Sequence, residues 1–440
     1  MSYIFHRFPG SLPPVAIGGD GIFIIDNEGN RYIDASGGAA VSCLGHSNAR
    51  VRDAIIAQAG KLAFAHTSFF TSEPAEALAE FLVKRAPGKL TKVHYTSGGS
   101  EAVETALKLA RQYFVAKGEP KRNLVISRER SYHGGTLGAV AISGNAWRRA
   151  PFEPLLFSSV QIEACYPYRG RQPHETDSEY GLRVANELER EILAREPGVV
   201  AAFVAETVIG ATAGAVPPVE GYFKRIREIC DRHGVLLILD EVMSGMGRTG
   251  TLFAFEQEGI SPDIVTIAKG MGAGYQPIGA TLCTQEIFDT INLHDGFAHG
   301  HTYLGHAIAC AAALEVQKVI EDENLLENVR MMGQYLHESL SERFGQHPNI
   351  GDIRGRGLFQ AIELVEDRET KQPFNSSRKL HAVIKRNAMD RGLMVYPTGG
   401  VADGKSGDHV LLAPPYIVTR SEVDTIVDRL GSAVDAALQG

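Results

Sequence analysis

Polar residues that could do chemistry follow several apolar, strand-like runs of the sequence. Gly98-Gly99-Ser100-Glu101 follows residues 92–97 and precedes a helix-like segment. A small turn that opens a helix directs free backbone N–H groups and the helix dipole at an anion. The same letters also suit a plain helix cap with Ser100 as the capping residue. The turn therefore predicts either a phosphate site or a cap.

An acid and a lysine end two further apolar runs. Asp240-Glu241 follows residues 235–239, and Lys269 follows residues 264–268. A carboxylate at the end of a buried strand needs a partner, which an ion pair or a helix cap could supply. Burial lowers the pKa of a lysine and makes its amine nucleophilic, whereas a lysine on a solvated loop gains no such reactivity. An anion site, an acid and a lysine amine are the three partners that pyridoxal phosphate requires.

Alternating strand-like and helix-like segments must position these residues. Strand patterns occur at 92–97, 123–127, 199–206, 235–242, 263–270 and 278–284, with helical patterns at 101–114, 180–194 and 222–234. This alternation predicts an α/β fold with a mostly parallel sheet covered on both faces. Ligands bind at the carboxyl ends of the strands in such sheets, where the three polar segments lie.

The pattern changes after about residue 320. Two long helical stretches, 307–344 and 377–392, alternate there with short strands, and a hairpin pattern occupies residues 22–34. We therefore predict a smaller α+β domain built from both ends of the chain. The predicted boundaries are 1–60 for its N-terminal segment, 61–320 for the large cofactor-binding domain, and 321–440 for its C-terminal part.

Composition excludes several classes of function. The chain has 440 residues and a net charge of −8, which argues against a nucleic-acid partner or an anionic membrane surface. No apolar run reaches the roughly 20 residues that a membrane helix needs, and the N-terminus lacks an apolar signal core. The five cysteines are scattered and odd in number, which favours a reducing cytoplasm.

Two further patterns suggest other functions. Residues 399–406, GGVADGKS, fit the phosphate-loop pattern of nucleotide-binding proteins. A strand-like run at 410–412 and Pro414-Pro415 follow it, however, where that site needs a helix. The cluster His294, His299, His301 and His306 suggests a metal, but carboxylates and cysteines at ligand spacing are missing nearby. We therefore predict a loop at 399–406 and no metal site.

The longer motifs resemble the class III pyridoxal-phosphate-dependent aminotransferases, particularly the omega-amine and omega-amino-acid transaminases. The resemblance runs from GNRYIDASGG to LLAPPYIVTR and includes TSGGSEAVETALKLAR, SYHGGTLGA, LILDEVMSGMGRTG, DIVTIAKGMGAGYQPIGA and HTYLGHAIACAAAL. It implies fold type I, with a mainly parallel seven-stranded sheet in the large domain. It also implies a homodimer or a dimer of dimers with shared active sites.

The resemblance assigns roles to single residues. Lys269 would hold pyridoxal 5′-phosphate as a Schiff base and move a proton, and Asp240 would keep the pyridine nitrogen protonated. The phosphate would be bound by Gly99, Ser100, and Thr302 of a neighbouring subunit, and the two ring faces would be covered by Tyr132 and Val242. Glu206 would lie near the cofactor, and Arg420 would bind an acceptor carboxylate. Met243 replaces a glutamine that is common in the family, and Ala40 stands where aromatic-amine enzymes carry a bulky residue.

These observations predict an aminotransferase that moves an amino group from an amine or omega-amino acid to a keto acid, with pyruvate favoured. The reaction would pass through Schiff-base and pyridoxamine phosphate intermediates. An amino-acid epimerase, an aminomutase or a decarboxylase on the same fold stays open, because these enzymes use the same cofactor motifs. A nucleotide-binding protein is the remote alternative. The sequence does not identify the amino donor.

Overall fold

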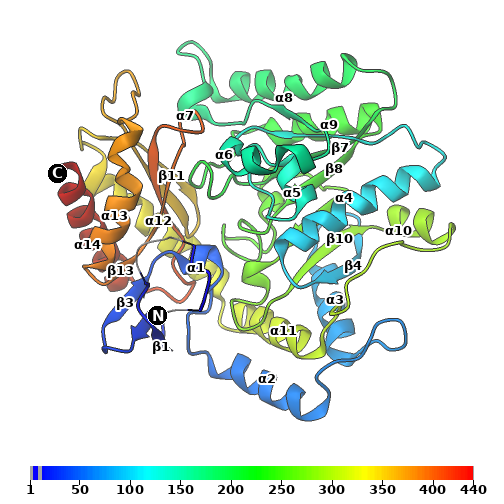
Figure 1. Cartoon of the computed structure of the whole chain (residues 1–440), viewed down its shortest axis with the longest axis horizontal. Helices are drawn as coiled ribbons and strands as arrows, with labels where there is room; N and C mark the ends of the chain where they lie inside the picture. Colours follow the sequence, from blue (N-terminus) through cyan, green and yellow to red (C-terminus); the bar gives the residue numbers. More distant parts are fainter. Residues whose placement is uncertain (1–2, 8–11, 440) are drawn as a thin grey trace.

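The large domain is built on one seven-stranded sheet, shown on the right in Figure 1. The computed structural model describes residues 3–7 and 12–439, so residues 1–2, 8–11 and 440 of the predicted segments lie outside it. The strand order is β4 (Leu90–Thr96), β10 (Gly279–Thr284), β9 (Ile264–Ile267), β8 (Leu236–Asp240), β7 (Val200–Glu206), β5 (Leu124–Arg128) and β6 (Val160–Ile162). Only β10 runs antiparallel to its neighbours, which confirms the predicted mainly parallel sheet.

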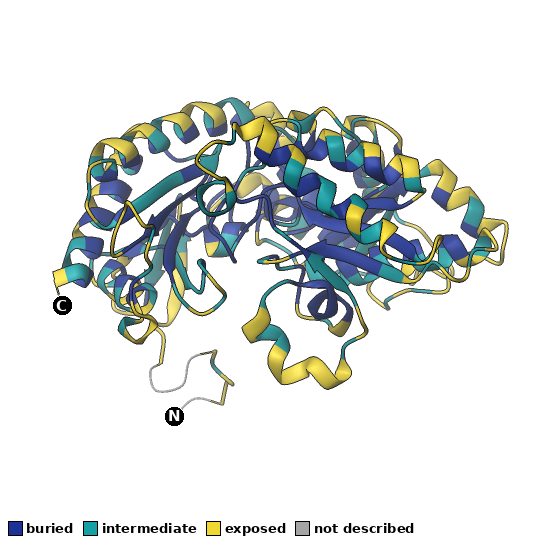
Figure 2. Cartoon of the chain, turned by 90° about the horizontal axis from the view of Figure 1, so that it is seen from above, coloured by how far each residue is buried: buried dark blue, intermediate teal, exposed yellow. Residues whose placement is uncertain are grey.

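Side chains of the central strands alternate between two apolar cores. In β8, Leu237 and Leu239 face one core, while Leu236 and Ile238 face the other. The first core is covered by α3 (Glu73–Arg85), α8 (Asp177–Leu193), α9 (Tyr222–His233) and α11 (Ala307–Asp322), and the second by α4 (Gly99–Ala116), α5 (Leu137–Ile142) and α10 (Gln285–Asn292). The sheet is therefore buried on both faces, as its apolar strands predict, and Figure 2 shows exposed residues on the outer helices.

The small domain contains two four-stranded sheets. One has the order β1 (Ala16–Asp20), β2 (Phe23–Asp26), β3 (Arg31–Asp34) and β13 (Leu393–Met394), and the other β11 (Ile350–Arg356), β12 (Phe359–Leu364), β15 (Asp408–Leu412) and β14 (Tyr396–Gly399). Its helices are α12 (Leu325–Phe344), α13 (Leu380–Met389) and α14 (Arg420–Gln439). Because β13 pairs in parallel with β3, the two ends of the chain share one sheet. The domain boundaries at 60 and 320 stay a prediction.

The short elements lie mostly in connections. They are α1 (Gly37–Ala40), α2 (Ala49–Lys61), α6 (Ala146–Arg149), α7 (Pro167–Gly170), and the 3₁₀ turns at Ala150–Leu155, Ala254–Glu258, Lys269–Met271 and Ser376–Arg378. The long helical stretch expected at 307–344 is two helices instead of one. The chain breaks at Asn324, whose φ of 51° is left-handed and cannot continue a helix.

Candidate active site

A cavity of about 450 Å³ lies where β7, β8 and β9 end and α4 begins. Seven of the predicted site residues line it together: Gly99, Ser100, Tyr132, Glu206, Asp240, Val242 and Lys269. They come from five separate segments, so the parallel strands bring together what the sequence holds far apart. Val41, Met243, Gly274 and Gln276 complete parts of the wall.

The N-terminus of α4 forms one end of the cavity. Gly98 occupies the N-cap position, and the first helical bond runs from Ala102 N–H to Gly98 C=O at 3.0 Å. Among the described residues, no acceptor lies within hydrogen-bonding distance of the N–H groups of Gly99 and Ser100. Because Gly99 and Ser100 line the cavity, this helix end has the free donors that an anion site requires.

Ser100 is not the helix cap. Its Oγ accepts a hydrogen bond from Gly135 N–H at 2.9 Å, and no side chain caps α4. Two glycines let this turn pack closely. A Cβ on Gly99 would lie 2.7 Å from Val242 Cγ1, and a Cβ on Gly134 would lie 2.7 Å from Ser100 Oγ. The sequence allowed either a phosphate site or a helix cap at this turn, and the prediction that Ser100 caps the helix is wrong.

Asp240 also lines the cavity and is 4% exposed. Its Oδ2 lies 2.8 Å from His133 Nδ1, and its Oδ1 accepts from Val242 N–H at 3.0 Å. This buried acid thus has two partners, the His133 ring and a backbone amide. Sequence reasoning missed His133, although it follows Tyr132 in the SYHG motif.

Lys269 follows β9 after one residue, Ala268, and lines the cavity. Its backbone is left-handed, with a φ of 45°, which turns the chain sharply after the strand. Burial lowers the pKa of the Lys269 amine to about 8, against the opposing effect of the Asp240 and Glu206 carboxylates. A substantial fraction of the amine is therefore neutral near physiological pH, as a nucleophile or base requires.

Glu206 accepts hydrogen bonds from two separate backbone segments. Its Oε1 accepts from Tyr132 N–H at 3.1 Å, and its Oε2 accepts from Gly210 N–H at 2.7 Å. Burial raises the pKa of this carboxyl group, although the nearby His133 acts in the opposite direction. Tyr132 is therefore held in place at the cavity wall by its main chain.

Three predicted residues lie outside the cavity wall. Thr302 is exposed in the loop before α11. Ala40 is buried in one apolar cluster with Val208 and Met243, which line the cavity, and the next residue, Val41, lines it as well. Residues 39 and 40 both have left-handed backbones. Arg420 is exposed at the start of α14, with its guanidinium carbon 4.1 Å from the Tyr335 ring centroid. The structure thus does not bring Arg420 to the predicted carboxylate site.

The cavity suits pyridoxal phosphate in its chemistry. It offers two unpaired backbone N–H groups for a phosphate, a buried carboxylate for a ring nitrogen, and a desolvated amine for an aldehyde. Tyr132 and Val242 supply the flat and apolar surfaces. Within residues 3–7 and 12–439, no group of three or more His, Cys, Asp and Glu side chains is arranged to hold a metal ion.

The chain belongs to the class III aminotransferase family. The sequence profile of that family matches residues 11–434. An uncharacterised aminotransferase of Schizosaccharomyces pombe is 45% identical over 99% of this chain and 96% of its own length. A diaminobutyrate–2-oxoglutarate transaminase of Halomonas elongata is 36% identical over 96% of this chain and 90% of its own.

Solved structures place the fold in the same class. An omega transaminase of Pseudomonas jessenii in complex with PMP is 36% identical and superposes with a TM-score of 0.91, covering 97% of this chain and 93% of its own. The fold is therefore that of the fold type I enzymes, and pyridoxal 5′-phosphate is the cofactor. No helix in the described part of the chain is both long and apolar enough to cross a membrane.

Proposed function

We propose that this aminotransferase moves an amino group from an amine or omega-amino acid to pyruvate. The observation that carries the acceptor is the charge of the cavity wall. Among the described residues that line it there is no guanidinium, and the one lysine, Lys269, is assigned to the cofactor. A second carboxylate on a short keto acid would lie against this wall without a guanidinium to pair it, and burying an unpaired carboxylate is costly. This favours an acceptor with one carboxylate.

The proposed roles follow from the positions of the side chains. Pyridoxal phosphate, when bound, supplies the electron sink that weakens a C–H bond of the amino donor. The N–H groups at the start of α4 and the Ser100 hydroxyl hold its phosphate. Asp240 keeps a proton on its ring nitrogen, and His133 fixes the orientation of that carboxylate through the 2.8 Å contact. Lys269 moves the proton of the donor carbon, which its lowered pKa permits.

We further propose that the enzyme works as a homodimer or as a dimer of dimers. Thr302 is the residue expected to bind the phosphate of a neighbouring active site. Its exposure in the single chain, away from the chain's own cavity, supports that arrangement. The molar mass of the purified protein in solution tests the oligomer. A Thr302→Ala variant with unchanged cofactor affinity would contradict the shared site.

The experiment that tests the function follows the visible absorbance of the holoenzyme. A panel of amines and omega-amino acids is added first, and pyruvate or 2-oxoglutarate second. We expect a donor to bleach the band and pyruvate to restore it, with alanine as the product. Recovery with 2-oxoglutarate alone would overturn the proposed acceptor. Turnover without any keto acid would indicate an epimerase, an aminomutase or a decarboxylase, and carbon dioxide release would identify the last.

A further inference from the structure

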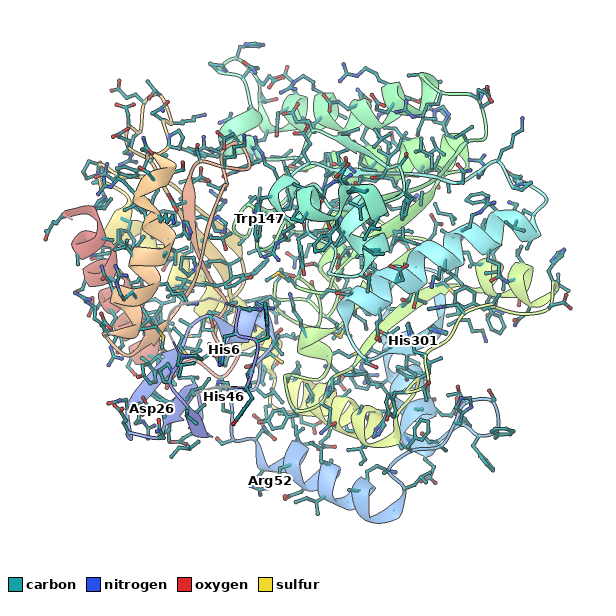
Figure 3. All side chains as sticks on the ribbon, in the orientation of Figure 1. His6, Asp26, His46, Arg52, Trp147 and His301 are labelled. Carbon is teal, nitrogen blue, oxygen red and sulfur yellow. The ribbon has the colours of Figure 1, made fainter. Side chains whose placement is uncertain are left out.

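An arginine outside the catalytic cavity stacks on one of its walls. The guanidinium carbon of Arg148 lies 4.9 Å from the ring centroid of Tyr132 and 4.5 Å from that of Trp147. Tyr132 lines the catalytic cavity, and Glu206 holds its main chain. Figure 3 shows Trp147 between the ribbons of the large and small domains. Arg148 is therefore held one aromatic ring beyond the cavity.

The guanidinium of Arg148 makes no hydrogen bond to the part of the chain that the structure describes. Within the described part of the chain, no carboxylate or carbonyl oxygen lies within bonding distance of its side chain. The neighbouring Arg149 differs, because its guanidinium donates to the carbonyls of Ala141 and Ser143 and pairs with Glu153. Arg149 thus holds the fold, whereas Arg148 is oriented by two rings that leave its N–H edge available.

We propose that Arg148 binds the distal carboxylate of an omega-amino-acid donor. This inference rests on the proposed function, which places the amine of the donor at Lys269. No guanidinium lines the cavity among the described residues, so the carboxylate of a long donor needs a cation from beyond the cavity wall. A donor that extends past Tyr132 reaches a planar, half-buried guanidinium there. Guanidinium groups bind carboxylates through two parallel hydrogen bonds.

Arg420 is the competing cation. It also stacks on a tyrosine ring, that of Tyr335, at 4.1 Å. Tyr335 belongs to α12 and donates to Asp424 of α14, so this stack lies on an outer helix pair of the small domain. Arg420, Tyr335 and Asp424 do not line the catalytic cavity. The two stacks therefore offer a direct comparison between an arginine at the cavity wall and an arginine away from it.

The test compares donors that differ only in the carboxylate. Values of kcat/KM are measured for a series of omega-amino acids and for alkylamines of matched chain length. We expect Arg148→Gln to lower kcat/KM for omega-amino acids by about 10- to 100-fold, the usual effect of losing hydrogen bonds to a charged group. The alkylamines should change by less than about threefold, since they have no carboxylate. For omega-amino acids, kcat/KM of Arg148→Lys should lie between the values of the wild type and of Arg148→Gln, because a lysine supplies the charge without the paired donors.

Two controls separate the possible outcomes. Visible absorbance and melting temperature show that each variant is folded and holds its cofactor, and Arg420→Gln is measured beside Arg148→Gln. The proposal is overturned if Arg148→Gln affects both donor series equally or neither. It is also overturned if Arg420→Gln shows the selective loss, or if the wild-type enzyme accepts alkylamines but no omega-amino acid. Failure of the wild-type enzyme to aminate pyruvate with any donor would overturn the proposed function itself.

Discussion

Two glycine-rich turns of this chain resemble each other in sequence but differ in the secondary structure that follows them. Gly98-Gly99-Ser100 connects β4 to α4, an 18-residue helix that begins at the catalytic cavity. Residues 399–406, GGVADGKS, connect β14 to β15, two antiparallel strands with Gly399 opposite Asp408. A phosphate loop needs a helix after it, so the second turn is a hairpin connection and the predicted loop is confirmed.

The direction of the backbone N–H groups explains the difference. At the first turn, Gly99 and Ser100 line the cavity, and no acceptor among the described residues takes their N–H groups. At the second, the N–H groups of Lys405 and Ser406 donate to the carboxylate of Asp403 at 2.8 and 2.6 Å. An anion cannot use donors that an internal carboxylate already occupies. A glycine-rich pattern therefore predicts an anion site only together with the element that follows it.

The largest difference in activity is expected between Lys269, which lines the same cavity as the first turn, and Lys405, which lies in the second turn. We expect Lys269→Ala to lower kcat by at least about 100-fold, the loss typical of a missing proton-transfer group. Lys405→Ala should leave kcat/KM within about twofold, because Lys405 is exposed in the hairpin. Steady-state kinetics on both holoenzymes checks this. Full turnover by Lys269→Ala would refute the assignment of the amine, and loss of activity in Lys405→Ala would revive a role for the hairpin.

The pH dependence of cofactor attachment tests the environment of Lys269. Only the neutral amine reacts with an aldehyde, and burial lowers the pKa of Lys269 from 10.5 to about 8. The neutral form therefore increases as the pH rises through about 8. We expect attachment of pyridoxal phosphate to apoenzyme to slow about tenfold per pH unit below that midpoint. Mass spectrometry after borohydride reduction measures the rate, and a midpoint near 10.5 would contradict the desolvated position.

The two serines give a smaller and more direct comparison. Ser100→Ala removes a hydroxyl proposed to bind phosphate, and Ser406→Ala removes one from the hairpin. A hydrogen bond to a charged group contributes about 1.5–3 kcal/mol, so Ser100→Ala should weaken pyridoxal phosphate binding by roughly tenfold or more. Ser406→Ala should not change it. Titration of apoenzyme followed by absorbance measures both affinities, and equal values would show that the first turn does not hold the phosphate.

The sequence predicted the parts of the site that depend on local patterns. An apolar run followed by a polar residue marks a strand end, so Asp240 and Lys269 could be found without a structure. The contact of His133 with Asp240 joins residues 107 positions apart and depends on how the segment after β5 turns back over the sheet. The hydrophobic periodicity of the sequence does not indicate such a contact. The SYHG motif was the available signal.

The features that the sequence did not indicate have a common physical cause, which is backbone conformation or packing set by distant parts of the chain. Ala40 lies behind Val208 and Met243 of the cavity wall, in a segment where residues 39 and 40 are left-handed, and alanine letters give no sign of that. Arg420 lies over Tyr335 because α12 packs on α14. The break at Asn324 likewise depends on a left-handed residue inside a continuous apolar pattern.

The smallest expected effect concerns the carboxylate that closes the hairpin. Asp403→Ala leaves the N–H groups of Lys405 and Ser406 without their acceptor, but Asp403 is exposed and water can replace it. The loss of stability should be about 1 kcal/mol or less. Asp367→Ala is the matched control, because this carboxylate similarly accepts from Thr370 N–H in another exposed turn. Thermal unfolding and kcat/KM measure both variants. If Asp403→Ala lost more than about tenfold in kcat/KM while Asp367→Ala did not, the hairpin would act in catalysis, and the contrast between the two turns would fail.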